Sequence, residues 1–113
     1  FVPFSRLLPR AAALVHHGGI GTCAQGLSAG VPQIVMPLAY DQLDNVARLK
    51  RLGVADTLPP KRFTGPNLTR VLGNLLSNPS VAERAKHWAA DMAQHQPFVE
   101  TCLELEKLAR NHE

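Results

Sequence analysis

Residues 14–22 read Leu-Val-His-His-Gly-Gly-Ile-Gly-Thr, and this junction decides the fold of the chain. A strand is predicted over residues 11–16, because the continuously apolar residues 13–15 are typical of a parallel strand that is covered on both faces. Three glycines follow within four residues, and a helix of small residues is predicted over 21–29. A strand, a glycine-rich turn and a helix direct backbone N–H groups and the positive helix end toward a bound anion. Taken alone, the pattern is equally typical of doubly wound domains that bind no ligand there.

The rest of the chain continues the alternation of strand and helix and then becomes helical. The predicted elements are a strand over 33–36, an amphipathic helix over 41–52, a short strand at 54–55, and helices over 64–78, over 79–96 and from Phe98 onward. Gly30 and Gly53 are expected to end their helices in the left-handed conformation. Residues 1–9 are expected to be extended with a short turn, because Pro3 and Pro9 disfavour helix. The fold class is therefore α/β, a partial Rossmann-like parallel sheet of about three strands with flanking helices and a helical C-terminal part.

Periodicity also predicts which side chains face the core. In the four later helices these are Leu43, Val46, Leu49 and Leu52; Leu68, Val71, Leu72, Leu75 and Leu76; Ala82, Ala85, Trp88, Ala89 and Met92; and Phe98, Cys102, Leu105 and Leu108. Cys23 and Cys102 are expected to be two buried, reduced thiols, since no metal-binding spacing links them. This cysteine usage favours the cytoplasm.

Composition bounds the class of protein. The chain has 113 residues, 45% of them hydrophobic and 19% charged, which is typical of one folded domain. Its net charge is only +3 and the basic residues are scattered, so no nucleic-acid surface is predicted. No apolar run approaches the roughly 18 residues that a membrane span needs. The opening Phe1-Val2-Pro3-Phe4 suggests a piece of a longer protein.

Four short motifs in order carry a resemblance to a known family. They are residues 1–3 (Phe-Val-Pro), 17–22 (His-Gly-Gly-Ile-Gly-Thr), 29–32 (Ala-Gly-Val-Pro) and 37–42 (Pro-Leu-Ala-Tyr-Asp-Gln). Together they resemble the donor-binding signature of GT-B nucleotide-sugar-dependent glycosyltransferases, the group of UDP-glycosyltransferases and of bacterial macrolide and sterol glycosyltransferases. The resemblance implies that residues 1–113 are the C-terminal part of a donor-binding domain. It also implies that the acceptor domain, with its catalytic histidine base, lies outside this chain, so that no catalytic residue is expected here and the chain alone is expected to be inactive.

The resemblance implies a role for eight residues. His17, Gly19, Gly21 and Thr22 would bind the diphosphate, Phe1 would stack on the base, Gln25 would contact the ribose, and Asp41 and Gln42 would hydrogen-bond the transferred sugar. A hydrogen bond donated by His17 would stabilise the negative charge that develops on the departing diphosphate. His16 points to the other face of the strand and is expected to be structural. Asp41 has a structural alternative as a helix N-cap.

The donor would be a UDP- or dTDP-sugar, and the acceptor a small molecule or a lipid. Gln25 stands where the pattern of the plant glucosyltransferases of this family has a glutamate that holds the ribose hydroxyls, so the sequence does not decide between UDP and dTDP. Gly21 replaces an asparagine and Phe4 a glutamine of that pattern. No cofactor and no metal are expected, since no Asp-x-Asp pair is present and adjacent strand residues such as His16 and His17 diverge.

Three alternatives stay open from the sequence. The first is a nucleotide-sugar epimerase of the same architecture, and the second is a non-catalytic nucleotide-sugar binding module. A nicotinamide-binding Rossmann domain fits less well, because its glycine-rich turn follows the first strand of the domain. If flanking strands lie outside the chain, the strand ending near Val15 has an unpaired apolar edge through which the protein is expected to self-associate.

Overall fold

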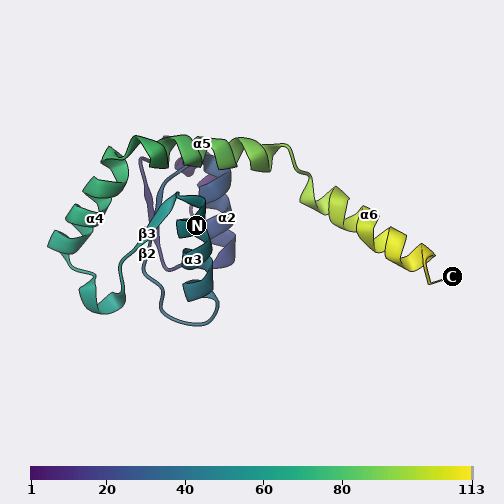
Figure 1. Cartoon of the computed structure of the whole chain (residues 1–113), viewed down its shortest axis with the longest axis horizontal. Helices are drawn as coiled ribbons and strands as arrows, with labels where there is room; N and C mark the ends of the chain where they lie inside the picture. Colours follow the sequence, from purple (N-terminus) through teal and green to yellow (C-terminus); the bar gives the residue numbers. More distant parts are fainter. Residues whose placement is uncertain (113) are drawn as a thin grey trace.

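The computed structural model describes residues 1–112 as a small α/β unit with an extended C-terminal helix (Figure 1). Its elements are α1 (Phe4–Leu7), η1 (Leu8–Arg10), β1 (Leu14–His16), α2 (Ile20–Ala29), β2 (Gln33–Val35), α3 (Gln42–Leu52), β3 (Ala55–Thr57), η2 (Pro60–Arg62), α4 (Gly65–Ser77), α5 (Pro79–Ala93) and α6 (Pro97–Arg110). The predicted α/β class, the alternation of three strands with helices and the helical second half are confirmed.

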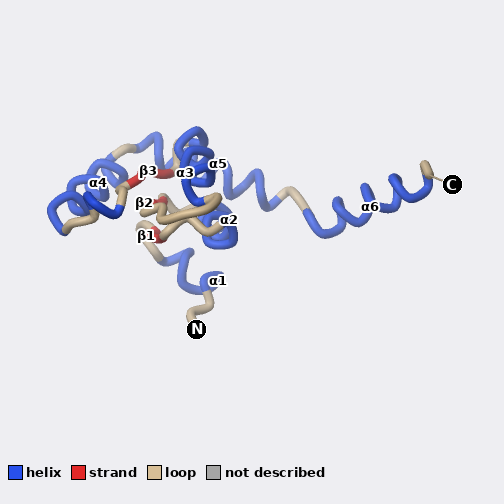
Figure 2. Tube along the Cα trace, turned by 90° about the horizontal axis from the view of Figure 1, so that it is seen from below, coloured by secondary structure: helices blue, strands red, loops and turns tan. Residues whose placement is uncertain are grey.

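The three strands form one parallel sheet in the order β1-β2-β3, visible edge to edge in Figure 2. Val15 pairs with Ile34, and Ile34 with Asp56. The parallel connections run through α2 and α3, as βαβ units require. The turn after β1 and the loop after β2 therefore lie next to one another, at the carboxyl-terminal ends of the two strands.

Two hydrophobic clusters cover the two faces of the central strand. Val35 packs with residues of α2, α3 and α5, namely Cys23, Val46, Leu49 and Ala85, together with Val54. Ile34 packs on the other face with residues of α4 and α5, namely Val71, Leu75 and Val81, together with Leu58. Successive strand residues point to opposite faces, so a continuously apolar strand needs this double cover.

Two glycines end helices as predicted. Gly30 (φ +70°) and Gly53 (φ +76°) cap α2 and α3 in the left-handed conformation. The chain can therefore reverse directly into β2 and β3.

The N-terminal segment differs from the prediction. Pro3 does not stop a helix but serves as the N-cap of α1, and its carbonyl accepts hydrogen bonds from the amides of Arg6 and Leu7. Proline is tolerated at a helix start because the missing N–H would have no partner there. The first strand is also shorter than predicted, since β2 begins only at Gln33, opposite Leu14.

The predicted inner faces are partly wrong. Val71, Leu75 and Ala85 are buried, but Leu43 and Leu76 are exposed, and on α5 Val81 is buried in place of Ala82. On α3 and α4 the buried stripe is therefore narrower than predicted, and on α5 it is shifted by one position.

Helix α6 departs most from the prediction. It buries no residue, and Phe98, Leu105 and Leu108 are 87%, 61% and 57% exposed. Cys102 is exposed as well, so the expectation of two buried thiols holds only for Cys23. Figure 1 shows why: α6 leaves the end of α5 and extends away from the sheet, giving the molecule extents of 61 × 30 × 28 Å.

Strand β1 lies at one edge of the sheet, with Val15 41% exposed. The unpaired apolar edge expected from the sequence is thus present in the described residues. No helix within residues 1–112 combines the length and the apolar character needed to cross a lipid bilayer.

Candidate functional site

The glycine-rich turn after β1 is shaped by close packing against the neighbouring strand. Gly18 has φ +95°, and a Cβ there would lie 2.8 Å from Cγ1 of Val35. Only glycine meets both conditions without strain. Gly19 then forms the N-cap of α2, with no side chain to accept the N–H groups of the first turn. Those N–H groups have no partner within the helix, so they are available to an outside acceptor.

His16 has a structural role, as predicted. Its Nε2 lies 2.7 Å from Oε1 of Gln33, and its Nδ1 accepts a hydrogen bond of 3.0 Å from the amide of Gly18. The Gln33 side chain is fully buried, and its Nε2 donates to the carbonyl of Cys23 at 3.2 Å. Burial lowers the pKa of His16, which favours the neutral ring that accepts from the amide of Gly18.

His17 points out of the turn and meets the loop that follows β2. Its Nδ1 lies 3.3 Å from Nε2 of Gln42, the first residue of α3. The Oε1 of Gln42 accepts hydrogen bonds from the amides of Leu38 and Ala39, at 2.7 and 3.0 Å. The predicted diphosphate residue and the predicted sugar residue are therefore in direct contact, although 25 positions separate them in the sequence.

Asn45 joins the two loops and was missed by the sequence analysis. Its Nδ2 donates to the carbonyl of Gly18 at 2.9 Å and to Oδ2 of Asp41 at 3.0 Å, and the residue is only 7% exposed. The available signal was its spacing, since four residues after Asp41 on a helix is the same face.

Asp41 occupies the N-cap position of α3, but its side chain makes no capping hydrogen bond. The structural alternative for this carboxylate is therefore not realised. Just before it, Tyr40 has φ +57°, which is uncommon outside glycine. A bulky residue in the left-handed region stores strain, and such positions cluster at functional sites.

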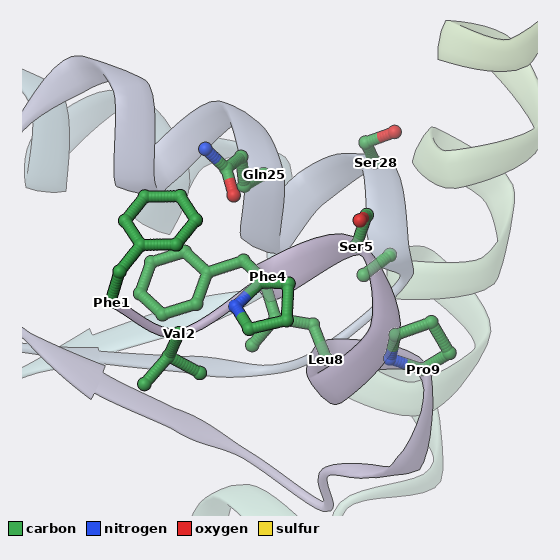
Figure 3. Close-up of a pocket in the computed structure, with 10 residues that line it drawn as sticks. Phe1, Val2, Phe4, Ser5, Leu8, Pro9, Gln25 and Ser28 are labelled. Carbon is green, nitrogen blue, oxygen red and sulfur yellow. The ribbon is translucent and has the colours of Figure 1, made fainter.

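A groove lies between the N-terminal segment and the later turns of α2. Figure 3 shows the rings of Phe1 and Phe4 below Gln25, with Ser28 one turn further along the helix. The groove has a volume of about 840 Å³ and a largely apolar floor to which Leu8 contributes. The structure thus brings the predicted base residue and the predicted ribose residue to one surface.

Gly21 lies in the first turn of α2, four positions before Gln25 and so on the same side of the helix. Apart from its chain neighbours and the backbone of its own helix, a Cβ at Gly21 would meet no atom within 4 Å. The protein therefore leaves the space above Gly21 open. Thr22, half-buried in the same first turn, and Cys23 complete this end of the helix. Burial raises the pKa of the Cys23 thiol, which keeps it protonated and unreactive.

Comparison with known proteins now assigns the family. Residues 1–108 match the family described as "Erythromycin biosynthesis protein CIII-like, C-terminal domain". The chain belongs to this family. The chain is 36% identical over 94% of its length to O-mycaminosyltylonolide 6-deoxyallosyltransferase of Streptomyces fradiae. It is 37% identical over 98% of its length to aklavinone 7-beta-L-rhodosaminyltransferase of Streptomyces galilaeus. It spans about a quarter of each of these proteins, 25% in both cases.

Solved structures agree with the fold. The glycosyltransferase VinC, solved in complex with dTDP, matches 98% of the chain with a TM-score of 0.86 and 32% identity, and the match covers 28% of VinC. Spinosyn forosaminyltransferase SpnP matches 96% of this chain, with a TM-score of 0.85 and 28% identity, and the match covers 29% of SpnP. The resemblance to GT-B glycosyltransferases is confirmed, and the epimerase alternative is not favoured.

Proposed function

We propose that this chain is the nucleotide-sugar binding part of a bacterial glycosyltransferase that transfers a hexose to a small-molecule acceptor of the macrolide or polyketide class. Residues 1–113 would form the C-terminal part of the donor domain, with the acceptor domain and its base in the preceding part of the protein. The observation that carries the proposal is the contact between His17 and Gln42. It lies beyond the carboxyl-terminal ends of two neighbouring parallel strands, where ligands of open α/β sheets bind.

The geometry supports an order for the donor along this surface. The diphosphate would lie over the first turn of α2, against the N–H groups after Gly19, with the hydroxyl of Thr22 beside it. From there the ribose would pass the open space at Gly21 and reach Gln25. The base would lie in the groove against Phe1, whose aromatic face suits stacking.

The sugar would lie on the other side of the diphosphate, by Asp41 and Gln42. In this position His17 would donate a hydrogen bond to the diphosphate as negative charge develops on it during transfer, which is electrostatic stabilisation. No metal ion and no cofactor belong to this proposal. A dTDP-sugar and a UDP-sugar are both compatible with an amide at Gln25.

Two further expectations stay part of the proposal. The protein is expected to work in the cytoplasm, where Cys23 and Cys102 would remain reduced thiols. Self-association through the free edge of β1 also stays a prediction.

A matched pair of glycine substitutions tests the site. Gly21→Ala and Gly73→Ala both place a methyl group on a helix where nothing lies within 4 Å, so neither should destabilise the fold. The affinity is measured by adding UDP or dTDP and following the amide signals of residues 17–22 by NMR. We expect saturable shifts in the unaltered chain, an affinity loss of about tenfold or more for Gly21→Ala, and no loss for Gly73→Ala. An unchanged affinity in Gly21→Ala would contradict the proposed path of the donor, and the absence of binding by the unaltered chain would contradict the site itself.

A further inference from the structure

The side-chain amide of Gln42 has a fixed orientation. Its Oε1 accepts two hydrogen bonds, from the backbone amides of Leu38 at 2.7 Å and Ala39 at 3.0 Å. A backbone N–H can only donate, so the atom facing both of them has to be the oxygen. A flipped amide would set two donors against its NH2 group. The Gln42 NH2 group is therefore directed away from the loop, toward His17.

This orientation determines which nitrogen of His17 carries the proton. The Gln42 NH2 group can only donate, and it lies 3.3 Å from Nδ1 of His17. The Nδ1 atom consequently accepts, and a neutral ring then carries its hydrogen on Nε2. The ring presents an N–H donor on the side away from Gln42.

We propose that Gln42 is a positioning residue for His17, which holds the ring in the tautomer that can donate from Nε2. The inference rests on the proposed function, in which His17 donates to the donor diphosphate. It changes the role expected for Gln42 from the sequence. Three of the four hydrogen-bonding positions of its amide are used within the protein, so one N–H is left for a sugar hydroxyl.

The surroundings of Gln42 are built to hold it in place. A Cβ at Gly18 would lie 3.3 Å from the Cβ of Gln42, so the turn packs directly on this side chain. The loop that supplies the two amides closes through Tyr40 in the left-handed conformation at φ +57°. Asn45, one turn further along α3, ties the carbonyl of Gly18 to the same helix. A strained loop and a packed turn thus converge on one amide.

Nitrogen-15 NMR of the unaltered chain is the first test, since it reads the tautomer of His17 without any ligand. Spectra of a His17→Asn variant identify the His17 signals. We expect the neutral ring of His17 to carry its hydrogen on Nε2 and none on Nδ1. A neutral His17 ring that carries its hydrogen on Nδ1 in the unaltered chain would overturn the inference.

Gln42→Glu reverses the group that faces His17 while one carboxylate oxygen still accepts from the loop amides. The second oxygen can only accept, so we expect Nδ1 of His17 to gain a hydrogen. Gln94→Glu makes the same chemical change in the turn after α5 and should leave His17 as it was. If Nδ1 stays unprotonated in Gln42→Glu, Gln42 does not determine the tautomer and the inference fails.

Titration with dTDP separates this inference from the proposed function. Gln42→Leu removes the amide without adding charge, and we expect it to weaken dTDP binding by about threefold to tenfold. Unchanged affinity in Gln42→Leu would overturn the positioning role. If the tautomer responds to Gln42→Glu as expected but the unaltered chain binds neither UDP nor dTDP, the proposed function fails and the tautomer assignment stands.

Discussion

Gly26→Ala should destabilise this protein by about 2 kcal/mol, although alanine is the better helix former. A Cβ at Gly26 would lie 2.6 Å from both Cδ and Nε2 of Gln33. Carbon atoms pack best at about 3.5–4.0 Å, so the Gln33 amide would have to retreat by about 1 Å. That amide is fully buried and holds the hydrogen bonds to His16 and to the carbonyl of Cys23.

The magnitude follows from three terms. Overpacking of a buried site costs about 1–3 kcal/mol. A polar group left without its partner costs a further 1–3 kcal/mol or so. Against these costs, alanine stabilises a helix interior by about 0.8–1.0 kcal/mol relative to glycine. The lower half of each cost range gives a net loss of about 2 kcal/mol.

Urea unfolding followed by the fluorescence of Trp88, the single tryptophan, measures this change. Gly73→Ala is the matched control, since a Cβ there meets nothing within 4 Å and stability should rise by up to about 1 kcal/mol. In a Gln33→Ala background the Gly26→Ala methyl group has room, so its cost should shrink or vanish. A Gly26→Ala protein as stable as the unaltered one, with Gly73→Ala behaving as expected, would refute the packing argument.

Two further predictions concern the polar groups around the turn. The pKa of His16 is lowered from 6.5 in the folded protein, so the unfolded chain binds more protons just below pH 6.5. Stability should therefore fall as the pH drops below 6.5 and level off once the pH is below the lowered pKa. His16→Asn, which keeps an acceptor for the Gly18 amide, should reduce this pH dependence in urea midpoints, and an unchanged slope would count against it. Asn45→Leu should cost about 1–3 kcal/mol, because the carbonyl of buried Gly18 loses its donor; Asp44→Asn, on the exposed neighbour, is the control, and equal urea midpoints for the two variants would contradict the assignment.

The sequence was informative wherever one local rule decided the structure. Gly30 and Gly53 end their helices because the left-handed conformation suits glycine. Val71 and Leu75 lie on a helical stripe and are buried. His16 and His17 follow one another in an extended segment, so their different environments follow from the alternation of a strand.

The sequence was not informative where the outcome depends on distant partners. The contact of His17 with Gln42 depends on how the loop closes through Tyr40, and no local pattern predicts a positive φ at tyrosine. The apolar stripe of α6 predicts a helix face that packs against other residues, but periodicity does not say whether those residues belong to this chain.

The isolation of α6 makes the unfolding of this chain a process with two parts. An isolated helix of its 14 residues is marginal in water, since packing supplies most helix stability in proteins. Exposed ion pairs such as Lys107 with Glu104 add only a few tenths of a kcal/mol. Its helical signal should therefore fade gradually on heating, while the sheet and the packed helices melt together at higher temperature. Far-UV circular dichroism averages the two processes, whereas Trp88, which donates a hydrogen bond to the carbonyl of Leu52, reports only on the cooperative part.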